Sequence, residues 1–369
     1  MIQMMRLFNE AKRVEGPVLV HVITQKGKGY EPAMRHPARF HGTTAFDIAT
    51  GLPLKKSKPT CTDIFSTVMR KMGDREKNVV AVTAAMPTGT GLKRFANMFP
   101  ERFFDVGIAE GHAVTFSAGL AAQGLVPYCN IYSSFMQRAY DNVIHDVAIQ
   151  RLPVVMCLDR GGLVGEDGAT HHGAFDLAYF GTVPNLTVAA PMNELELRNM
   201  MFTALEAGRP FAIRYPRGNG AGVAWRDEPF AAMEIGRGRC LKEGERIAVL
   251  TIGTVGNFAS EAIARMEADG IRVAHYDLRF AKPLDQELLH EVGRKFRCVV
   301  TVEDGALRGG VGEAVVAFFC EHGYLPKVVS LGIPDRFVEH GTPAQLYAQC
   351  GYDAEGIYRT LKSLQESLQ

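Results

Sequence analysis

A regular alternation of two kinds of segment, beginning at Thr62, is the feature that most constrains the fold of this chain. Short continuous apolar runs, typical of strands buried on both faces, alternate with longer segments whose apolar residues recur at helical spacing. The predicted strands are 79–82, 103–106, 127–131, 153–158, 186–189 and 211–215. The predicted helices are 62–72, 92–98, 111 onward, 135–150 and 194–207. This alternation predicts an α/β fold with a mostly parallel sheet covered by helices.

The same alternation resumes after an irregular, glycine-rich segment at 218–229. Here the predicted strands are 247–253, 273–277, 298–302 and 328–331, and the predicted helices are 258–268, 287 onward, 311–319 and a terminal helix. We therefore expect two doubly wound domains, at 58–225 and 226–369. The glycine cluster at 305–312 superficially resembles a nucleotide-binding turn, although a tight strand-to-helix turn is the favoured interpretation.

The first 57 residues follow a different pattern. Apolar residues at a spacing near three predict a helix over Ile2–Arg13, and the apolar run Val18–Thr24 predicts a strand buried in a parallel sheet. A glycine-rich basic turn then leads into a segment from Glu31 to about Thr60 that is rich in Pro, His, Gly and Lys. We expect this segment to be a long connector between domains.

Composition narrows the class of protein. The chain has 41 Lys and Arg against 40 Asp and Glu, so no overall field favours nucleic acid or a membrane surface. Apolar runs are shorter than the ~18 residues of a spanning helix, and the N-terminus lacks a signal-peptide core. The seven cysteines are scattered singly without a CxxC pair, which is typical of reduced core thiols. We expect a cytoplasmic protein.

A single carboxylate, Glu110, lies between a predicted strand and a predicted helix of small residues within 103–124. Gly107 ends the strand, and the helix starts at Gly111. An acid at such a turn can simply accept hydrogen bonds from the free N–H groups of the first helical turn. The alternative is a functional acid, and the polar residues at neighbouring strand ends favour it.

The segment 159–179 places an acid, a base and a cation on one glycine-rich loop after a predicted strand. Arg160 follows the strand, and His171 and His172 come four and five residues after Asp167. In doubly wound sheets, ligands bind at this end of the strands. Either histidine alone could be a surface residue, but beside an acid and a guanidinium at least one is predicted to carry protons. A metal site is disfavoured because no third and fourth ligands follow at a recognisable spacing.

Two further strand ends supply aromatic and basic residues. Tyr132, Phe135 and Arg138 suit a flat heterocycle and an anionic substrate, although core packing of Phe135 and solvation of Arg138 are alternatives. Arg214 and Arg217 lie at the end of the last strand of the first domain. Guanidinium groups match phosphate oxygens bidentately, so this pair is a candidate phosphate site.

Several long motifs occur in an order and spacing that closely resemble the 1-deoxy-D-xylulose-5-phosphate synthase family, thiamine diphosphate enzymes of the transketolase group. The motifs are IAEGHAVTFSAGLA, YSSFMQRAYDNVIHDVAIQRLPV, DRGGLVGEDGATHHGAFDLAY, RYPRGN, KGKGYEPA, DLRFAKPLD and VTVEDGALRGGVG. The resemblance extends through essentially the whole chain. It implies a transketolase-like pyrimidine-binding domain at 58–225, a transketolase C-terminal domain at 226–369, and the remnant of a diphosphate-binding domain with a linker at 1–57.

The resemblance also implies roles for individual residues. Glu110 matches the glutamate that hydrogen-bonds N1′ of the aminopyrimidine, a role that needs an acid kept protonated or sharing a proton. Phe135 matches the aromatic residue that stacks on that ring. The other implied positions are cofactor contacts at Lys26 and Tyr30, active-site histidines at His41 and His171, pocket residues at Asp167 and Tyr132, a phosphate-binding pair at Arg160 and Arg217, and a polar-cluster residue at Arg138.

The implied reaction is decarboxylation of pyruvate and carboligation to D-glyceraldehyde 3-phosphate by a homodimer. Two departures from the family pattern matter. Position 111 is Gly where Gln is more usual, and the chain has no Gly-Asp-Gly motif, so the Mg²⁺ ligands are expected in a missing domain. A truncated polypeptide, a proteolytic fragment, or half of a split enzyme with a partner chain would explain this. Such a chain is predicted to be inactive alone.

Two other classes of protein remain open from the sequence. The chain could be the pyrimidine-binding half of a transketolase or of a 2-oxo acid dehydrogenase β subunit, although the combination of RYPRG with GEDGATHHGAFD argues against that. It could also be a non-catalytic assembly module. Retention of Glu110, Arg160, Asp167, His171 and Arg217 counts against loss of the site.

Overall fold

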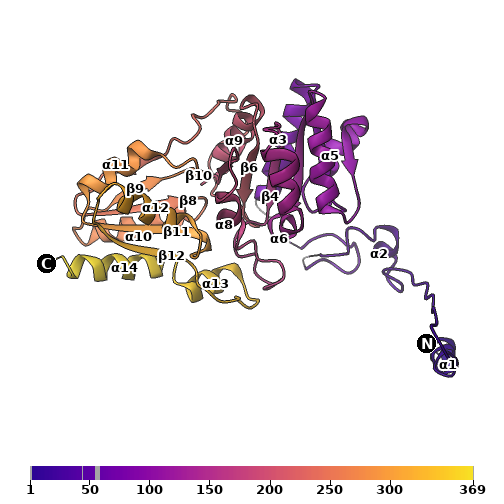
Figure 1. Cartoon of the computed structure of the whole chain (residues 1–369). Coiled ribbons are helices and arrows are strands. Elements are labelled where there is room, and N and C mark those ends of the chain that lie inside the picture. The colour runs from indigo at the N-terminus through magenta and orange to yellow at the C-terminus, as the bar shows by residue number, and fades with distance from the viewer. Residues whose placement is uncertain (1, 44, 55–58, 369) are drawn as a thin grey trace. The chain divides into compact units, whose positions relative to one another are not determined.

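The computed structural model describes residues 2–43, 45–54 and 59–368 (Figure 1). The chain divides into two compact units, residues 1–57 and 58–369. The domain boundary predicted between positions 57 and 58 lies outside the described residues.

The first unit contains α1 (Ile2–Ala11) and α2 (Glu31–Arg35). The predicted N-terminal helix is therefore confirmed, but the strand predicted at Val18–Thr24 is wrong. A strand needs a neighbour to satisfy its backbone groups, and no strand among the described residues of this unit pairs with this run. Leu19 is 94% exposed. The rings of Phe40 and Phe46, within the predicted connector, form a small aromatic cluster with Tyr30, which precedes it; the ring centroids are 5.2–5.8 Å apart.

The second unit begins with a seven-stranded sheet in the order β10-β5-β6-β4-β3-β1-β2. Its first six strands along the chain are β1 (Val79–Thr83), β2 (Phe103–Asp105), β3 (Val126–Tyr132), β4 (Val155–Asp159), β5 (Thr187–Ala189) and β6 (Phe211–Tyr215), and they pair in parallel. The strand predicted at 103–106 is not buried as expected, because β2 is the edge strand and its residues are partly or fully exposed.

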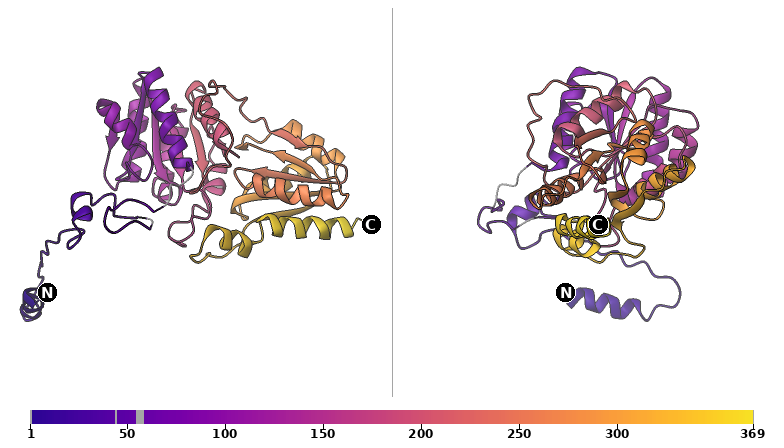
Figure 2. Two further views of the ribbon diagram at one scale, coloured as in Figure 1. Left: turned by 180° about the vertical axis from the view of Figure 1, so that it is seen from behind. Right: turned by 90° about the vertical axis from the view of Figure 1, so that its left-hand side faces the viewer.

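Helices cover both faces of this sheet (Figures 1 and 2). One face carries α3 (Cys61–Arg75), α4 (Lys93–Met98) and α9 (Glu194–Glu206), whose apolar residues share a core with the sheet. The other face carries α5 (Glu110–Ala122), α8 (Asp176–Gly181) and the segment after β3. The single helix predicted at 135–150 is instead four short pieces: α6 (Ser133–Met136), η2 (Gln137–Ala139), α7 (Tyr140–Asn142) and the π-helix η3 (Val143–Ala148).

The second sheet has the order β12-β11-β8-β9-β7. Its strands are β7 (Arg239–Lys242), β8 (Ile247–Ile252), β9 (Ala274–Asp277), β11 (Cys298–Ala306) and β12 (Lys327–Ile333), and only β7 is antiparallel. Its helices are α10 (Gly256–Ala268), α11 (Gln286–Lys295), α12 (Val311–Glu321), α13 (Pro343–Cys350) and α14 (Ala354–Glu366). The predicted fold class, two doubly wound and mostly parallel α/β sheets, is confirmed.

The two sheets are joined by more than their connecting segment. The short strand β10 (Phe280–Lys282) lies between β9 and β11 in the sequence, but it belongs to the first sheet. There it pairs antiparallel with β5 at the sheet edge. One buried apolar core continues from α5 and α8 into α11 and α12. The two sheets and their helices therefore form one compact unit with a shared apolar core.

Two smaller predictions are settled by the fold. The glycine cluster at 305–312 is a strand-to-helix turn, as favoured, and Glu303 accepts hydrogen bonds from the N–H groups of Val311 and Gly312 at the start of α12. All seven cysteines are free. Four of them are buried, but Cys240 and Cys320 are exposed, so they are not the core thiols that the sequence suggested.

Candidate active site

The carboxyl ends of β1, β2, β3, β4 and β6 lie next to one another because these strands are parallel neighbours in the first sheet. The strand order reverses direction beside β1, which has β2 on one side and β3 on the other. Crevices at such a reversal are where doubly wound sheets bind ligands. Eight of the eleven residues predicted for the site lie at or after these strand ends.

Glu110 is the first residue of α5 and is 5% exposed. Its Oε1 accepts a hydrogen bond of 2.7 Å from Nη1 of Arg138, which lies on η2. The resemblance implied a hydrogen bond from Glu110 to the cofactor and assigned Arg138 only to a polar cluster. The structure instead joins the two as an ion pair, and the Arg138 side chain is 59% exposed.

Phe135 lies at the centre of an aromatic and basic group. Its ring stacks against Tyr132 at 5.6 Å and meets His171 edge-on at 5.4 Å. The guanidinium carbon of Arg138 lies 5.0 Å from the ring centre. The structure thus brings Glu110, Phe135 and His171 to one place, with Arg138 between the acid and the ring.

A cavity of about 510 Å³ opens beside this group, and Arg160 and Arg217 line it together with Lys93 and Arg94 of α4. The guanidinium of Arg160 lies 3.8 Å from the centre of the Tyr132 ring. Nη1 of Arg217 donates to Oδ2 of Asp167 at 2.7 Å, in a pair that is about two-fifths exposed. The lining holds four cationic side chains, one carboxylate (Asp63) and small polar groups, and this excess of positive charge suits an anion.

The position of Arg160 depends on residues that the sequence analysis did not single out. Asp159, at the end of β4, is fully buried and accepts hydrogen bonds from Arg160 at 2.9 Å and from the Thr62 hydroxyl at 2.8 Å. Burial raises the pKa of the Asp159 carboxyl, an effect that Arg160 opposes. Burial also raises the pKa of Tyr132. An acid that ends a buried strand and precedes an arginine is a signal that could have identified Asp159.

Arg214 does not belong to the cation-lined cavity, so its prediction as part of a phosphate site is wrong. It lies within β6 and points away from the cavity edge, because successive side chains of a strand face opposite sides. Its Nε donates to Asp176 at 3.0 Å, and its Nη2 donates to the carbonyl oxygen of Asp304 at 2.7 Å. Arg217, three residues further on, is the residue of this motif that reaches the cavity.

The two adjacent histidines have different surroundings. His172 is 5% exposed; its Nδ1 accepts from the N–H of Val164, and its Nε2 lies 3.3 Å from the carbonyl oxygen of Glu339. This ring is therefore a structural residue. His171 is half-buried, and its Nδ1 lies 2.8 Å from the Thr170 hydroxyl. Its contact with Phe135 makes it the histidine of the candidate site.

The remaining three predicted residues belong to the first unit. Nζ of Lys26 lies 2.5 Å from Nδ1 of His41, so the structure brings these two together. The Tyr30 hydroxyl donates to the carbonyl oxygen of Ile48 at 2.8 Å, and its ring is part of the aromatic cluster of this unit.

The second unit offers what an aminopyrimidine ring would need on this chain: a buried carboxylate at Glu110 and a half-buried aromatic face at Phe135. These two groups therefore fit the pyrimidine end of the cofactor that the resemblance implies. Among residues 2–43, 45–54 and 59–368, no group of three or more His, Cys, Asp or Glu side chains could hold a metal ion.

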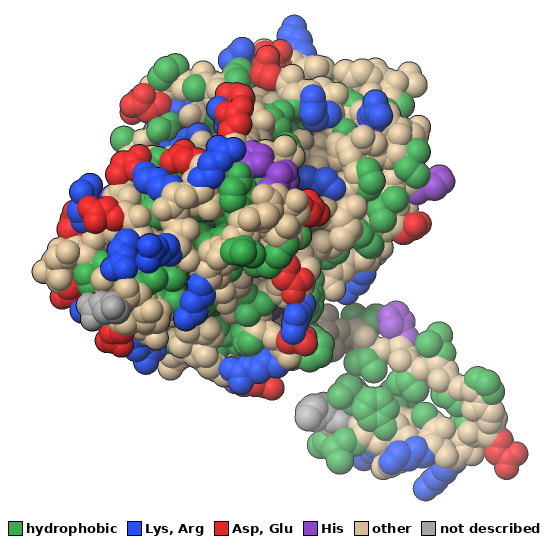
Figure 3. Space-filling model, turned by 60° about the vertical axis from the view of Figure 1, so that its left-hand side comes forward, with side chains coloured by type: hydrophobic (Ala, Val, Ile, Leu, Met, Phe, Trp, Pro, Cys, Tyr) green, Lys and Arg blue, Asp and Glu red, His purple; other side chains and the backbone are tan. Residues whose placement is uncertain are grey.

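The visible surface carries charges of both signs. Acidic and basic side chains are interspersed on the body of the molecule in the view of Figure 3, in keeping with the formal net charge of +1. Within the described part of the chain, no helix has the length and apolar character needed to cross a membrane.

Comparisons with known proteins give the same picture. Two family models match the chain: the transketolase pyrimidine binding domain at residues 57–222, and the transketolase C-terminal domain at residues 236–357. The chain is 53% identical over 362 residues to a 1-deoxy-D-xylulose-5-phosphate synthase of Bacteroides fragilis, and 47% identical over 355 residues to that of Aquifex aeolicus. Each match covers 96% of this chain and 56% of the relative. The chain thus spans little more than half the length of these relatives.

Two solved structures are similar in fold. One is described as a split gene transketolase, inactive beta4 tetramer; it matches with a TM-score of 0.74 and 29% identity, over 83% of this chain and 98% of that one. The other is a transketolase from Campylobacter jejuni, with a TM-score of 0.69 and 18% identity, over 84% of this chain and 48% of that one. At 18% identity the second match supports the fold alone.

Proposed function

Because this chain belongs to the transketolase-like 1-deoxy-D-xylulose-5-phosphate synthase family, we propose that it is the pyrimidine-binding and C-terminal part of such a synthase. The reaction is the thiamine diphosphate-dependent decarboxylation of pyruvate and carboligation to D-glyceraldehyde 3-phosphate. Its products are 1-deoxy-D-xylulose 5-phosphate and CO₂. The sugar phosphate is a precursor of isoprenoids, thiamine and pyridoxal.

The observation that supports this function best is the grouping of a buried acid, an aromatic face, a histidine and cavity-lining arginines at one edge of one sheet. Bound thiamine diphosphate supplies the electron sink for decarboxylation. In the proposal, Glu110 hydrogen-bonds N1′ of the pyrimidine, and Phe135 stacks on that ring. His171 and Asp167 carry or orient protons near the reacting carbons.

The arginines of the cavity serve the aldehyde substrate in this proposal. Arg160 and Arg217 bind the phosphate of D-glyceraldehyde 3-phosphate, with Tyr132 and Arg138 beside them. Asp167 keeps Arg217 in place by their ion pair until phosphate binds. Arg160 is already fixed by the buried Asp159, so it offers its free donors without a large loss of side-chain freedom.

We propose that the diphosphate end of the cofactor and its Mg²⁺ are held by a diphosphate-binding domain outside this sequence, which spans 56% of its relatives' length. In this proposal Lys26 and Tyr30 are cofactor contacts, and His41 is an active-site histidine. We propose a separate chain as one source of that domain, since one similar structure is described as a split gene transketolase. A homodimer is the assembly we expect, and the free cysteines favour a reducing, cytoplasmic location.

The function can be tested with the purified chain, Mg²⁺ and thiamine diphosphate, with and without a polypeptide that carries the diphosphate-binding domain of a similar synthase. Release of CO₂ and formation of the sugar phosphate from pyruvate and D-glyceraldehyde 3-phosphate are measured. We expect negligible turnover by the chain alone and turnover by the mixture. In the mixture, Glu110→Gln should reduce kcat by about 10²–10⁴-fold, whereas the exposed Glu101→Gln should not.

Three outcomes would contradict the proposal. Turnover by the chain alone would mean that the cofactor site is complete within it. Sugar phosphate donors or lipoyl acceptors used in place of the proposed substrates would assign the chain to a transketolase or to a 2-oxo acid dehydrogenase. A monomeric mass at micromolar concentration would exclude the homodimer.

A further inference from the structure

The loop that carries three of the proposed site residues, residues 160–173, has its two ends fastened together. It leaves β4 at Arg160 and returns before α8, and Asp167 and His171 lie within it. The N–H of Gly162 donates to the carbonyl oxygen of Gly173 at 2.8 Å, and the N–H of Gly173 donates back to Gly162 at 2.8 Å. This pair closes the loop at its base.

The base of the loop rests on the second sheet, through Asp304 of β11. Oδ1 of Asp304 accepts a hydrogen bond of 3.0 Å from the N–H of Leu163, and the N–H of Ala306 donates to the carbonyl oxygen of Ala174 at 2.7 Å. Gly162 has a φ of +81°, and a Cβ there would lie 1.9 Å from Oδ2 of Asp304. The carboxylate therefore packs directly on the loop backbone.

Asp304 is itself held from several directions. It is 3% exposed, and its oxygens accept from the hydroxyl of Tyr352 at 2.8 Å and that of Tyr347 at 3.3 Å. Its carbonyl oxygen accepts from Arg214, which also binds Asp176 of the first domain. A carboxylate with this many partners is fixed in place, so it can fix the backbone that it binds.

The outer part of the loop also lies against the C-terminal part of the chain. His172 Nε2 lies 3.3 Å from the carbonyl oxygen of Glu339, and the N–H of Gly341 donates to Gly165 at 3.4 Å. A Cβ on Gly165 would lie 2.9 Å from Cδ of Pro343. The loop is thus attached to the second sheet at its base, and along its length to the segment 339–343 that leads into α13.

We propose that Asp304 is a positioning residue, through which the C-terminal domain sets the place of Arg160, Asp167 and His171 in the site. The contacts above attach the loop to the C-terminal domain, and the importance of this attachment for substrate rests on the function proposed for the loop. If Asp304 only stabilised the fold in general, its replacement would not affect the loop in particular. A change confined to the loop therefore distinguishes the positioning role.

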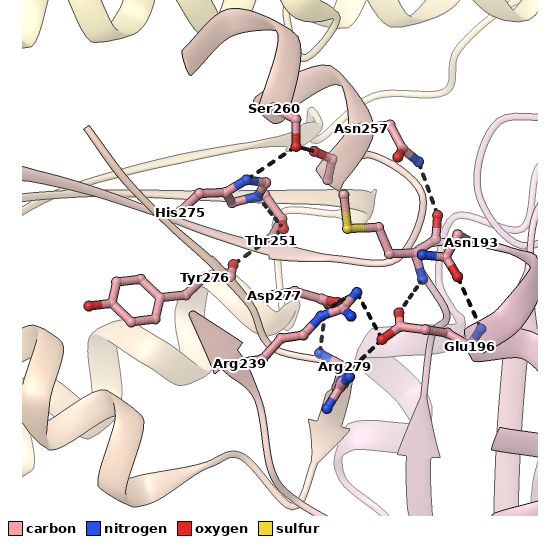
Figure 4. A network of polar contacts seen from close by, with 12 residues as sticks. Asn193, Glu196, Arg239, Thr251, Asn257, Ser260, His275, Tyr276, Asp277 and Arg279 are labelled. Atoms are coloured by element: carbon pink, nitrogen blue, oxygen red, sulfur yellow. Dashed lines mark hydrogen bonds and ion pairs between the residues drawn. The ribbon is translucent and has the colours of Figure 1, made fainter. Parts of the chain in front are cut away.

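The experiment compares backbone amide exchange in the full chain for Asp304→Asn and for a matched control, Asp277→Asn. Asp277 is another fully buried carboxylate of the second sheet; it binds Arg239, which in turn pairs with Glu196 of the first domain, and the described contacts of Asp277 do not include the loop (Figure 4). We expect Asp304→Asn to accelerate exchange of the Leu163 amide and of the loop by about ten-fold or more. Asp277→Asn should leave loop exchange unchanged.

Two further measurements keep the test decisive. Tyr352→Phe removes one support of Asp304 and should accelerate exchange in the same segment, but less, even if Asp304→Asn fails to fold. Calorimetric affinity for glycerol 3-phosphate should fall several-fold in Asp304→Asn and not in Asp277→Asn.

Loop exchange that is unchanged in Asp304→Asn, or equally accelerated in Asp277→Asn, would overturn the positioning role. Absence of glycerol 3-phosphate binding by the unmodified chain would instead contradict the phosphate site of the proposed function, while the exchange data would still decide the attachment.

Discussion

Acidification is expected to destabilise the second sheet through one histidine, His275 of β9. The ring is 2% exposed, and its nitrogens lie 3.0 Å from the Thr251 hydroxyl and 3.3 Å from the Ser260 hydroxyl (Figure 4). Burial, together with the nearby positive charge of Arg239, lowers the pKa of His275 to about 4 from the usual 6.5. Neither hydroxyl can compensate for the charge of a buried imidazolium.

The sign and size of the effect follow from linkage. Because the folded pKa is depressed, the unfolded chain binds a proton at His275 below pH 6.5 when the folded chain does not, and stability falls as the pH drops. This loss begins near pH 6.5 and is complete near pH 4, where it reaches about 3 kcal/mol. Between pH 7 and pH 5 the share of this one residue is about 2 kcal/mol.

The assay is urea denaturation followed by far-UV circular dichroism at pH 7 and pH 5. The decrease in unfolding free energy between the two pH values should be about 2 kcal/mol smaller in His275→Gln than in the unmodified chain. The control is Val249→Ala, which creates a cavity at a buried position of the neighbouring strand β8. It should lower the unfolding free energy at both pH values without changing the difference between them. A pH dependence in His275→Gln equal to that of the unmodified chain would refute the reasoning.

Three other substitutions test the fold and the site. Phe280→Ala should lower the unfolding free energy by about 3–5 kcal/mol, because the ring is fully buried where β10 joins the first sheet; a loss below about 1 kcal/mol in urea denaturation followed by tryptophan fluorescence would contradict this. Thr60→Ala should cost about 1 kcal/mol in the same assay, because its side chain forms a reciprocal capping box with Asp63 at the start of α3, and an unchanged stability would show the cap to be dispensable. Arg217→Ala should weaken calorimetric binding of glycerol 3-phosphate by about ten-fold or more, whereas the exposed Arg226→Ala should not, and equal effects would exclude a specific phosphate contact.

The buried strands were predictable from the sequence because their signal is local. Continuous apolar runs such as 247–252 and 211–215 fit only a strand covered on both faces, and the structure has strands there. The same rule failed at Val18–Thr24, because an apolar run forms a strand only when a neighbouring strand is present to pair with it. Strands β7 and β10 were missed for a related reason: they are short or polar, and distant partners define them.

The residues of the candidate site could be predicted as a set, but their pairing could not. Acids, aromatics and arginines were predicted at strand ends, and the structure has them near one edge of the first sheet. The sequence did not show that Arg138 pairs with Glu110, or that Arg214 faces Asp176 and Asp304, since these contacts depend on which side each side chain faces. Asp304 lies 141 positions from the loop residue Leu163 that it binds, too far for any local pattern to connect them.

The strand β10 has a consequence for how the chain acquires its structure during synthesis. Residues 280–282 supply the outermost strand of a sheet whose other strands all lie within 79–215. On the ribosome, the first six strands emerge well before their seventh, so the outer edge of β5 stays open to other chains during this interval. A recombinant piece that stops near residue 225 would keep that edge open permanently. We therefore expect such a piece to aggregate, and a piece that extends past residue 282 and completes the second sheet to remain monodisperse.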